Sequence, residues 1–189
     1  GVVDCHDTPG FIANRIGTFW MQAAMRGAIE LNVSVEAADA VLSAPFGVPK
    51  TGIFGLLDLV GLDLMPHIMS SMRALLDADD AMLRGRDADD DLPQVIRDMI
   101  ANGYTGRKGK GGFYRLIRDG EKRSKEAVDL ASGKYRIATN SRLAAVAAAR
   151  SGGMRAVLVH PSAAGQLAWQ VMSATILYAA ELVPAIADR

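Results

Sequence analysis

Apolar residues recur at intervals of three and four from Phe11 to Leu31, and this periodicity is the strongest structural constraint in the 189-residue sequence. Such spacing places the apolar side chains on one face of a long α-helix. That face must pack against other elements, so we predict a mainly α fold built around this segment. The apolar positions concerned are Phe11, Ile12, Ile16, Phe19, Trp20, Ala23 and Ala24.

Capping and helix-breaking residues predict several shorter helices in the rest of the first half. Serine is a favoured N-cap, and glycine and proline mark the places where helices end or loops begin. In order, the predicted elements are a helix after the N-cap Ser34 that ends at Pro45, a loop over 46–55, one short and one longer helix over 56–78 divided near Gly61 with Pro66 in the first turn of the second, a polar acidic segment over 77–91, and a helix over 92–103 that ends at Gly103.

The second half combines a small β-hairpin with further helices. A glycine-rich turn at 106–112 continues into a short strand, and residues 133–138 are a candidate second strand, so the two segments predict a hairpin. The remaining predicted elements are a helix over 141–152 that ends on glycines, a connector over 154–162 and a final long helix over 165–189.

Charge and cysteine content exclude several classes of protein. Lysine and arginine number 21, as do aspartate and glutamate, so no net charge favours nucleic acid or an anionic membrane. The single cysteine, Cys5, cannot form an internal disulfide, which fits the cytoplasm. The most apolar stretch, 163–187, is interrupted by polar residues, so we predict no membrane span. The N-terminus lacks the features of a signal peptide, and "GVVDC" looks like the tail of a β-strand whose partners are absent.

An offset of 155 residues aligns the first predicted helix with the last one. The offset sets "GFIANRIGTFWMQAAM" from Gly10 over "GQLAWQVMSATILYAA" from Gly165, with identities and close substitutions at half of the positions or fewer. Two amphipathic helices can align this well by chance, so the repeat is a hypothesis. In this alignment Asn14 corresponds to Trp169.

The histidines and the acidic segment offer little for catalysis or metal binding. His6 lies beside Cys5, but neighbours on a strand point to opposite faces, which argues against a nucleophile pair. His67 lies in an apolar helix pattern, where packing is the simpler role. Asp87, Asp89 and Asp91 have the first three spacings of an EF-hand loop, yet Leu92 stands where the loop needs glycine. We therefore predict no metal site.

The segment "GRKGKGG" at 106–112 resembles a phosphate-binding loop but matches neither of the two common glycine-rich motifs. It also precedes a strand, whereas phosphate loops open a helix. Lys108 and its neighbours could still hold a pyrophosphate as point charges. The surrounding basic residues leave open a nucleic-acid-binding module and an ordinary solvated hairpin. These residues are Arg107, Lys108, Lys110, Arg115, Arg118, Lys122 and Arg123.

Three segments in this order and spacing resemble the C-terminal domain of the 3-hydroxyacyl-CoA dehydrogenases. They are "DTPGFIANR" at 7–15, "FGVPKTGIFGLLDLVGLD" at 46–63 and "GRKGKGGFY" at 106–114. The resemblance covers about residues 1–118. Residues 119–189 are more weakly similar to the linker and second C-terminal repeat of the long, multifunctional fatty-oxidation members.

The resemblance implies a reaction and two site residues. Family members oxidise a 3-hydroxyacyl-CoA substrate to the 3-ketoacyl-CoA and pass hydride to NAD, while a His–Glu pair removes the hydroxyl proton. The asparagine of the first motif, here Asn14, supports that histidine and the substrate oxygen. The second basic residue of the third motif, here Lys108, approaches the dinucleotide. The resemblance thus implies Asn14 as catalytic and Lys108 as cofactor-binding.

The sequence also departs from the family pattern. The histidine, the glutamate and the glycine-rich dinucleotide fingerprint belong to an N-terminal Rossmann domain that would precede residue 1. His6 stands where the family commonly has lysine, so it is not the catalytic histidine. The second motif is one residue longer than the simpler family form, and the third reorders the glycine and lysine that follow Lys108.

We therefore interpret the sequence as a helical C-terminal domain over 1–118, a hairpin/helix linker over 119–161 and the first helix of a truncated second repeat over 162–189. The resemblance implies fatty acid β-oxidation, NAD bound mainly by the absent domain, a homodimer, and no nucleic-acid or membrane partner. We expect this chain alone to be inactive. The alternatives are a non-catalytic helical dimerisation or interaction module, a basic nucleic-acid-binding module, and a related dehydrogenase for another hydroxy acid.

Overall fold

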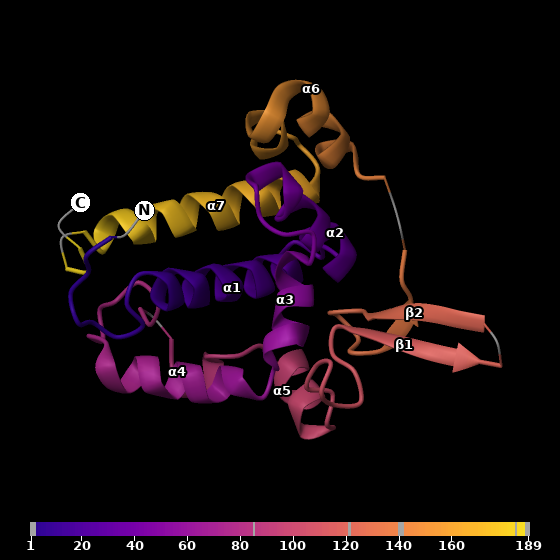
Figure 1. Ribbon diagram of the computed structural model, residues 1–189, viewed down its shortest axis with the longest axis horizontal. Coiled ribbons are helices and arrows are strands. Elements are labelled where there is room, and N and C mark those ends of the chain that lie inside the picture. Colours follow the sequence, from indigo (N-terminus) through magenta and orange to yellow (C-terminus); the bar gives the residue numbers. More distant parts are fainter. Residues whose placement is uncertain (1–2, 85, 121, 140–141, 184, 188–189) are drawn as a thin grey trace.

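The computed structural model describes residues 3–84, 86–120, 122–139, 142–183 and 185–187. Over these ranges the fold is mainly α, with a small antiparallel sheet, as the sequence predicts (Figure 1). The elements in chain order are α1 (Ala13–Glu30), α2 (Val35–Val41), the 3-10 turn η1 (Ala44–Phe46), α3 (Gly52–Val60), α4 (Leu64–Leu75), the 3-10 turn η2 (Ala88–Asp90), α5 (Gln94–Ala101), β1 (Tyr114–Asp119), β2 (Lys122–Val128), β3 (Tyr135–Ile137), α6 (Ala144–Leu158) and α7 (Ala163–Glu181).

Helices α1 and α7 form the central pair and run in opposite directions (Figure 1). At one end, the rings of Phe19 and Tyr178 stack with their centroids 4.2 Å apart. At the other end, Gly27 lets the helices approach so closely that an added Cβ would lie 2.8 Å from Leu167. The small residue at position 27 therefore allows the two longest helices to pack along their length.

Helix α4 lies on the other side of α1, so that α7, α1 and α4 form three layers in Figure 1. Methionines of α4 and apolar residues of α7 share one buried cluster with the first half of α1. A second and larger buried cluster joins the second half of α1 with α2, α3, α5 and the base of the sheet. The apolar face predicted for α1 therefore packs into two separate buried clusters, one along each half of the helix.

The predicted capping residues have the expected roles. The Ser34 hydroxyl accepts a hydrogen bond from the Ala37 N–H at 3.3 Å and caps α2. Gly61 separates α3 from α4 with a φ of 108°, a conformation that favours glycine. Pro66 lies in the first turn of α4, where its missing N–H has no helical partner to lose.

The sheet differs from the predicted hairpin. Strand β1 does not pair with residues 133–138; it pairs with β2, which in turn pairs with β3, so that the order is β1-β2-β3. The sequence "KRSKEAV" of β2 lacks alternating apolar residues, and only its end, Ala127 and Val128, is buried. The ammonium of Lys125 instead lies 3.7 Å from the ring centre of Tyr114 on β1, a cross-strand contact that polarity patterns do not reveal.

Helix α6 consists of two pieces. Gly153, with φ of 61° and ψ of −157°, has a non-helical backbone, so the first piece ends on its glycines as the sequence predicts. The segment 154–162, predicted as a connector, instead forms a second helical piece as far as Leu158, in which Val157 is fully buried.

Some predictions fall wholly or partly on positions outside the described ranges. They are the first two residues of "GVVDC", the helix start at Ser141, Pro184 and the last two residues of the final helix. Residues 3–6 form no strand; the His6 N–H donates to the Ile186 carbonyl at 2.7 Å. Among the described residues, no single helix is long and apolar enough to cross a membrane, and only the bent pair α3 and α4, at 92°, meets those criteria together.

One ion pair ties the far end of the sheet to the helices. Both guanidinium nitrogens of Arg136 on β3 donate to the Glu36 carboxylate of α2, at 2.7 and 2.8 Å, and the Thr139 N–H donates to it at 2.8 Å. Burial by itself would raise the pKa of Glu36, but these donors outweigh it and lower the pKa to about 2. The Glu36 carboxylate therefore stabilises the fold in its charged form.

This pair predicts a pH-dependent stability. Because the folded pKa of Glu36 lies below the unfolded value, its contribution is present above about pH 4.5 and is lost as the pH falls towards 2. In urea unfolding followed by circular dichroism, the free energy of unfolding of the wild type should exceed that of Glu36→Gln by about 2 kcal/mol at pH 7. This difference should disappear as the pH falls from about 4.5 to 2. Arg136→Met should show the same closing gap; a gap that is independent of pH would contradict the assignment.

Candidate functional site

The chain enters α1 through a tight turn made by residues 8–11. The Phe11 N–H donates to the Thr8 carbonyl at 2.9 Å, and both Gly10 (φ 77°) and Phe11 (φ 49°) have left-handed backbone conformations. A Cβ on Gly10 would lie 2.8 Å from the Met72 side chain of α4. Position 10 therefore requires glycine for two reasons, its backbone conformation and its contact with α4.

Asn14 and Arg15 follow this turn but have opposite environments. Asn14, in the first turn of α1, is exposed. Its neighbour Arg15 is only 6% exposed and extends into the protein. The first turn thus presents one amide to the surface and buries one guanidinium.

The Arg15 guanidinium joins three segments that are distant in the sequence. Its Nε donates to the Tyr178 hydroxyl of α7 at 2.5 Å, and its Nη2 donates to Asp80 Oδ2 in the acidic segment. The Tyr178 hydroxyl donates to Asp80 Oδ1 at 3.0 Å, which closes a triangle of hydrogen bonds. The Arg15 Nη1 also contacts the Pro9 carbonyl at 3.4 Å. We call Arg15, Asp80 and Tyr178 the clamp.

The clamp changes the acidity of its members. Burial lowers the pKa of Arg15, but the hydrogen bonds and charges of Tyr178 and Asp80 more than offset this and raise it above its ordinary value. Burial, together with the Asp80 charge, raises the pKa of Tyr178 to about 12, although the Arg15 hydrogen bond opposes the rise. At neutral pH the arginine is therefore charged and the tyrosine keeps its proton to donate.

The glycine-rich loop 106–112 is held against α3 by one buried carboxylate. Asp58 accepts from the Phe113 and Tyr114 N–H groups at 2.7 and 2.9 Å, and its own carbonyl accepts from the Arg107 N–H at 2.9 Å. A Cβ on Gly112 would lie 1.9 Å from the Asp58 carboxylate, and one on Gly106 would lie 2.5 Å from the Asp58 carbonyl oxygen. These two glycines are therefore needed for close packing.

A second buried carboxylate, Asp39 of α2, binds the start of α3. It accepts from the Phe54 and Gly55 N–H groups at 2.7 and 3.2 Å and from the Tyr114 hydroxyl at 2.8 Å. Burial raises the pKa of Asp39 to about 6, against these donors, and burial likewise raises that of Asp58 to about 6. Sequence reasoning did not identify either aspartate as structural, although Asp58 lies within the quoted second motif.

The loop uses its backbone N–H groups internally. Those of Gly106, Gly109, Lys110 and Gly112 donate to Gly111, Gly106, Gly103 and Tyr114 carbonyls respectively, at 2.8 to 3.1 Å. Together with the Arg107 N–H bonded to Asp58, they are not available to a phosphate, unlike those of a phosphate-binding loop. Five of the seven N–H groups of the loop are thus engaged internally, so an anion there would be held mainly by side chains.

A pocket of about 1060 Å³ opens beside the loop, between α2, α3 and the sheet. Asp39, Asp58 and Tyr114 contribute to its walls. Its cationic residues are Lys50, Arg107, Lys110, Arg115 and Lys125. Lys108 is exposed on the same loop but does not line this pocket.

The structure does not bring Asn14 and Lys108 together. Asn14 lies at the first turn of α1, which has 18 residues and is therefore about 27 Å long. The glycine-rich loop follows α5 and lies beyond the opposite end of α1 (Figure 1). The two predicted site residues therefore belong to separate surfaces of this chain.

The profile of the 3-hydroxyacyl-CoA dehydrogenase C-terminal domain matches residues 10–116 of the chain. The match begins at Gly10 of the entry turn and ends within β1, so it contains α1, both buried aspartates and the glycine-rich loop. The chain belongs to the family of 3-hydroxyacyl-CoA dehydrogenase C-terminal domains.

Several curated relatives are longer proteins. A protein of Rickettsia felis named as a fatty acid oxidation complex trifunctional enzyme is 36% identical over 188 residues, which is 100% of this chain and 25% of the relative. A Bacillus subtilis protein named as a 3-hydroxyacyl-CoA dehydrogenase is 32% identical over 193 residues, again 100% of this chain and 23% of the relative. The human mitochondrial hydroxyacyl-coenzyme A dehydrogenase is 32% identical over 60% of this chain and 33% of its own length.

The chain thus spans about a quarter of the first two relatives described. No solved structure matches it significantly. Within this 3-hydroxyacyl-CoA dehydrogenase domain, the clamp combines matched and unmatched segments, because Arg15 and Asp80 lie inside 10–116 while Tyr178 lies beyond it.

The other candidates from the sequence fall outside the three family motifs. The Nδ1 atom of exposed His6 is 3.1 Å from the Ala185 carbonyl, and that of His160 is 2.9 Å from the Ser162 hydroxyl at the start of α7. Asp91 of the acidic segment pairs with Arg73, with the shorter contact at 2.5 Å. Among the residues that the structure describes, no three potential metal ligands are grouped as a site.

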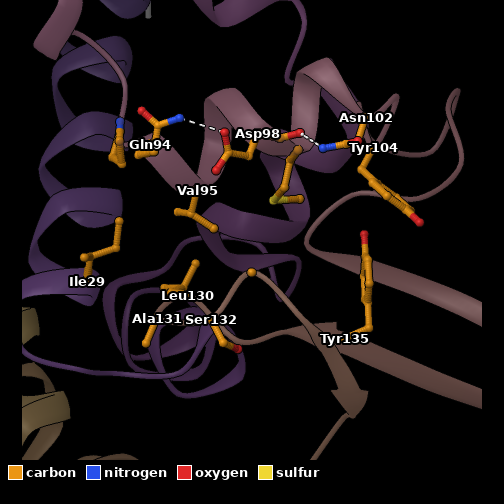
Figure 2. Close-up of a pocket in the computed structure, with 13 residues that line it drawn as sticks. Ile29, Gln94, Val95, Asp98, Asn102, Tyr104, Leu130, Ala131, Ser132 and Tyr135 are labelled. Atoms are coloured by element: carbon orange, nitrogen blue, oxygen red, sulfur yellow. Dashed lines mark hydrogen bonds between the residues drawn. The ribbon is translucent and has the colours of Figure 1, made fainter.

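A smaller pocket of about 410 Å³ lies between α5 and the turn that joins β2 to β3 (Figure 2). In Figure 2 the side chains of Val95 and Leu130 face each other across it, and Tyr104 and Tyr135 stand at one end. Gln94 donates to the Asp98 carboxylate at 2.7 Å along its rim. Neither Asn14 nor Lys108 lines this pocket.

The packing of the glycine-rich loop predicts the effect of one added methyl group. Gly112→Ala should destabilise this dehydrogenase domain by about 2 kcal/mol or more, because the new Cβ meets the Asp58 carboxylate and the Gly106 backbone. Gly17→Ala is the matched control: nothing lies within 4 Å of a Cβ there, and alanine favours the helix by up to about 1 kcal/mol. Equal unfolding midpoints of the two variants in urea would refute this packing argument.

Proposed function

We propose that the chain is the C-terminal part of an NAD-dependent 3-hydroxyacyl-CoA dehydrogenase of fatty acid β-oxidation. The substrate is a 3-hydroxyacyl-CoA, and NAD accepts the hydride when it is bound. The observation that carries the proposal is the position of Asn14: it lies within the family match and is exposed in the first turn of α1, directly after the strained entry turn. An N-terminal Rossmann domain of the same polypeptide would face this turn.

Asn14 offers the hydrogen bonds that this reaction needs. Its amide nitrogen can donate to the substrate oxygen, while its amide oxygen accepts from the imidazole N–H of a histidine in the partner domain. Because the glutamate of the His–Glu pair holds the other imidazole nitrogen, the N–H that Asn14 accepts from is the one formed when the imidazole removes the hydroxyl proton. The exposure of Asn14 supports this role, since a side chain packed inside the domain could not reach either group.

Lys108 is proposed to approach the dinucleotide. It is exposed and stands between Arg107 and Lys110, so the loop presents several cations that suit a pyrophosphate. Because five of the seven N–H groups of the loop are bonded internally, the contact would be made mainly by side chains. The main cofactor site would be supplied by the Rossmann domain.

We also propose the domain boundaries 1–118, 119–161 and 162–189, with α7 as the first helix of a second repeat. In the alignment offset by 155, Gln22 and Met25 of α1 correspond to Leu177 and Ala180 of α7. Gln22 and Met25 are buried against neighbouring elements, whereas Leu177 is 64% exposed and Ala180 is exposed. Leu177 and Ala180 would be buried if α7 had the neighbours that α1 has, and this supports α7 as the first helix of a second repeat. A homodimer and a cytoplasmic location complete the proposal.

Asn14→Ala in the whole polypeptide tests the function. Loss of the amide should lower kcat for 3-hydroxyacyl-CoA oxidation about 100-fold, because one preorganised hydrogen-bond donor is removed from the reacting oxygen. Asn32→Ala, an exposed asparagine at the other end of α1, is the control and should keep kcat within twofold. Unchanged turnover in Asn14→Ala would favour the non-catalytic interaction module instead.

Lys108→Ala in the whole polypeptide tests the cofactor contact. Removal of one cation should raise the KM for NAD about fivefold and leave kcat nearly unchanged, as expected for a screened charge. Lys134→Ala, an exposed lysine next to β3, is the matched control. A rise in the KM for the acyl-CoA instead would reassign Lys108 to the other substrate.

The chain of 189 residues alone should not turn over 3-hydroxyacyl-CoA, since the proposed histidine and dinucleotide fold are outside it. Spectrophotometric detection of NADH is the measurement, and measurable turnover would overturn the division of roles. Filter binding at two salt concentrations separates the nucleic-acid alternative, which requires salt-dependent binding through residues 107–123.

A further inference from the structure

The first turn of α1 lacks the usual means of fixing a helix start. Its N-cap residue is Ile12, whose side chain accepts no hydrogen bond, and the turn contains no acidic residue. The preceding Phe11 has a φ of 49°, a costly conformation for a large side chain. Some other interaction must therefore hold the turn that carries Asn14.

A buried arginine would by itself make this helix start less stable. Arg15 places a positive charge in the first turn, at the positive end of the helix dipole, and burial removes it from water. The negative charge of Asp80 faces it directly, with side-chain exposures of 7% and 11% for the two partners. The partners of Arg15 thus offset the cost of burying its charge, and the position of the guanidinium depends on them.

Those partners are themselves fixed. The Met82 N–H donates to Asp80 Oδ1 at 2.8 Å, which orients the carboxylate within its turn. The Tyr178 ring stacks on Phe19, one turn further along α1, and its hydroxyl links Arg15 Nε to Asp80. The guanidinium is therefore held from two directions, by the acidic segment and by α7.

We propose that Asp80 and Tyr178 are positioning residues for Asn14, acting through Arg15. Asn14 is adjacent to Arg15 in the same helical turn, so a guanidinium that is fixed on the buried side fixes the amide on the exposed side. Through Tyr178, helix α7 affects the position of Asn14, although α7 lies outside the family match. This inference rests on the proposed function of Asn14.

A double-mutant cycle in the whole polypeptide tests the coupling. Tyr178→Phe keeps the ring stacked on Phe19 and removes only the hydroxyl, so kcat should fall about tenfold while the KM for the acyl-CoA stays within twofold. In the Asn14→Ala background, the same substitution should change kcat less than twofold, because a misplaced amide matters only when the amide is present. Asp80→Asn, which keeps the shape but not the charge, should behave in the same way.

Ser162→Ala is the control for general loosening of α7. Ser162 caps the opposite end of the same helix, where its hydroxyl accepts from the Gly165 N–H at 3.2 Å. This variant should lower the melting temperature by a few degrees without changing kcat. If Tyr178→Phe and Asn14→Ala lower kcat independently, so that their effects multiply, Tyr178 does not act through Asn14 and the proposal is overturned.

The same experiment separates the two proposals. Unchanged kcat in Asn14→Ala alone rejects the proposed function. A large effect of Asn14→Ala with an unchanged kcat in both Tyr178→Phe and Asp80→Asn keeps the function and rejects the positioning role. The positioning role is also rejected if Tyr178→Phe and Ser162→Ala lower the melting temperature equally and have the same effect on kcat.

Discussion

The close antiparallel packing of α1 and α7 organises the helical part of the molecule, because α2, α3 and α6 all contact this pair. Gly27 sets the distance at one end and the Phe19–Tyr178 stack sets it at the other. Helix α4 completes the cluster on the far side of α1, while α2 and α6 cover α7. A change in the separation of the two long helices would therefore reach the entry turn, the clamp and both parts of the core.

Three buried polar groups explain features of the family motifs that the proposed chemistry does not need. Asp58 and Asp39 gather backbone N–H groups from the glycine-rich loop and from the start of α3, and so connect the second motif with the third. Arg15, the last residue of the first motif, serves the clamp. Within the first and third motifs, therefore, structural residues stand next to the residues proposed for the site.

Local signals predicted the helices well, since apolar periodicity, the Ser34 cap and the Gly61 break act within a few residues of the positions that they affect. Strand β2 was missed because its stability comes from cross-strand contacts such as Lys125 over Tyr114. The second helical piece of α6 after Gly153 was also missed, and its buried Val157 is again a tertiary effect. Asn14 and Lys108 came from family motifs. The partners of Arg15 could not be found from the sequence, because Asp80 and Tyr178 are 65 and 163 residues away.

The crowding around Asp58 has a consequence for the interpretation of glycine-rich segments. In nucleotide-binding loops, glycines leave N–H groups and space for a ligand. In the segment 106–112 the space at Gly106 and Gly112 is occupied by the protein itself, and five of the seven N–H groups are already bonded. A glycine-rich signature before a strand can thus indicate a closely packed joint between two segments, in which packing of the protein itself requires the glycines.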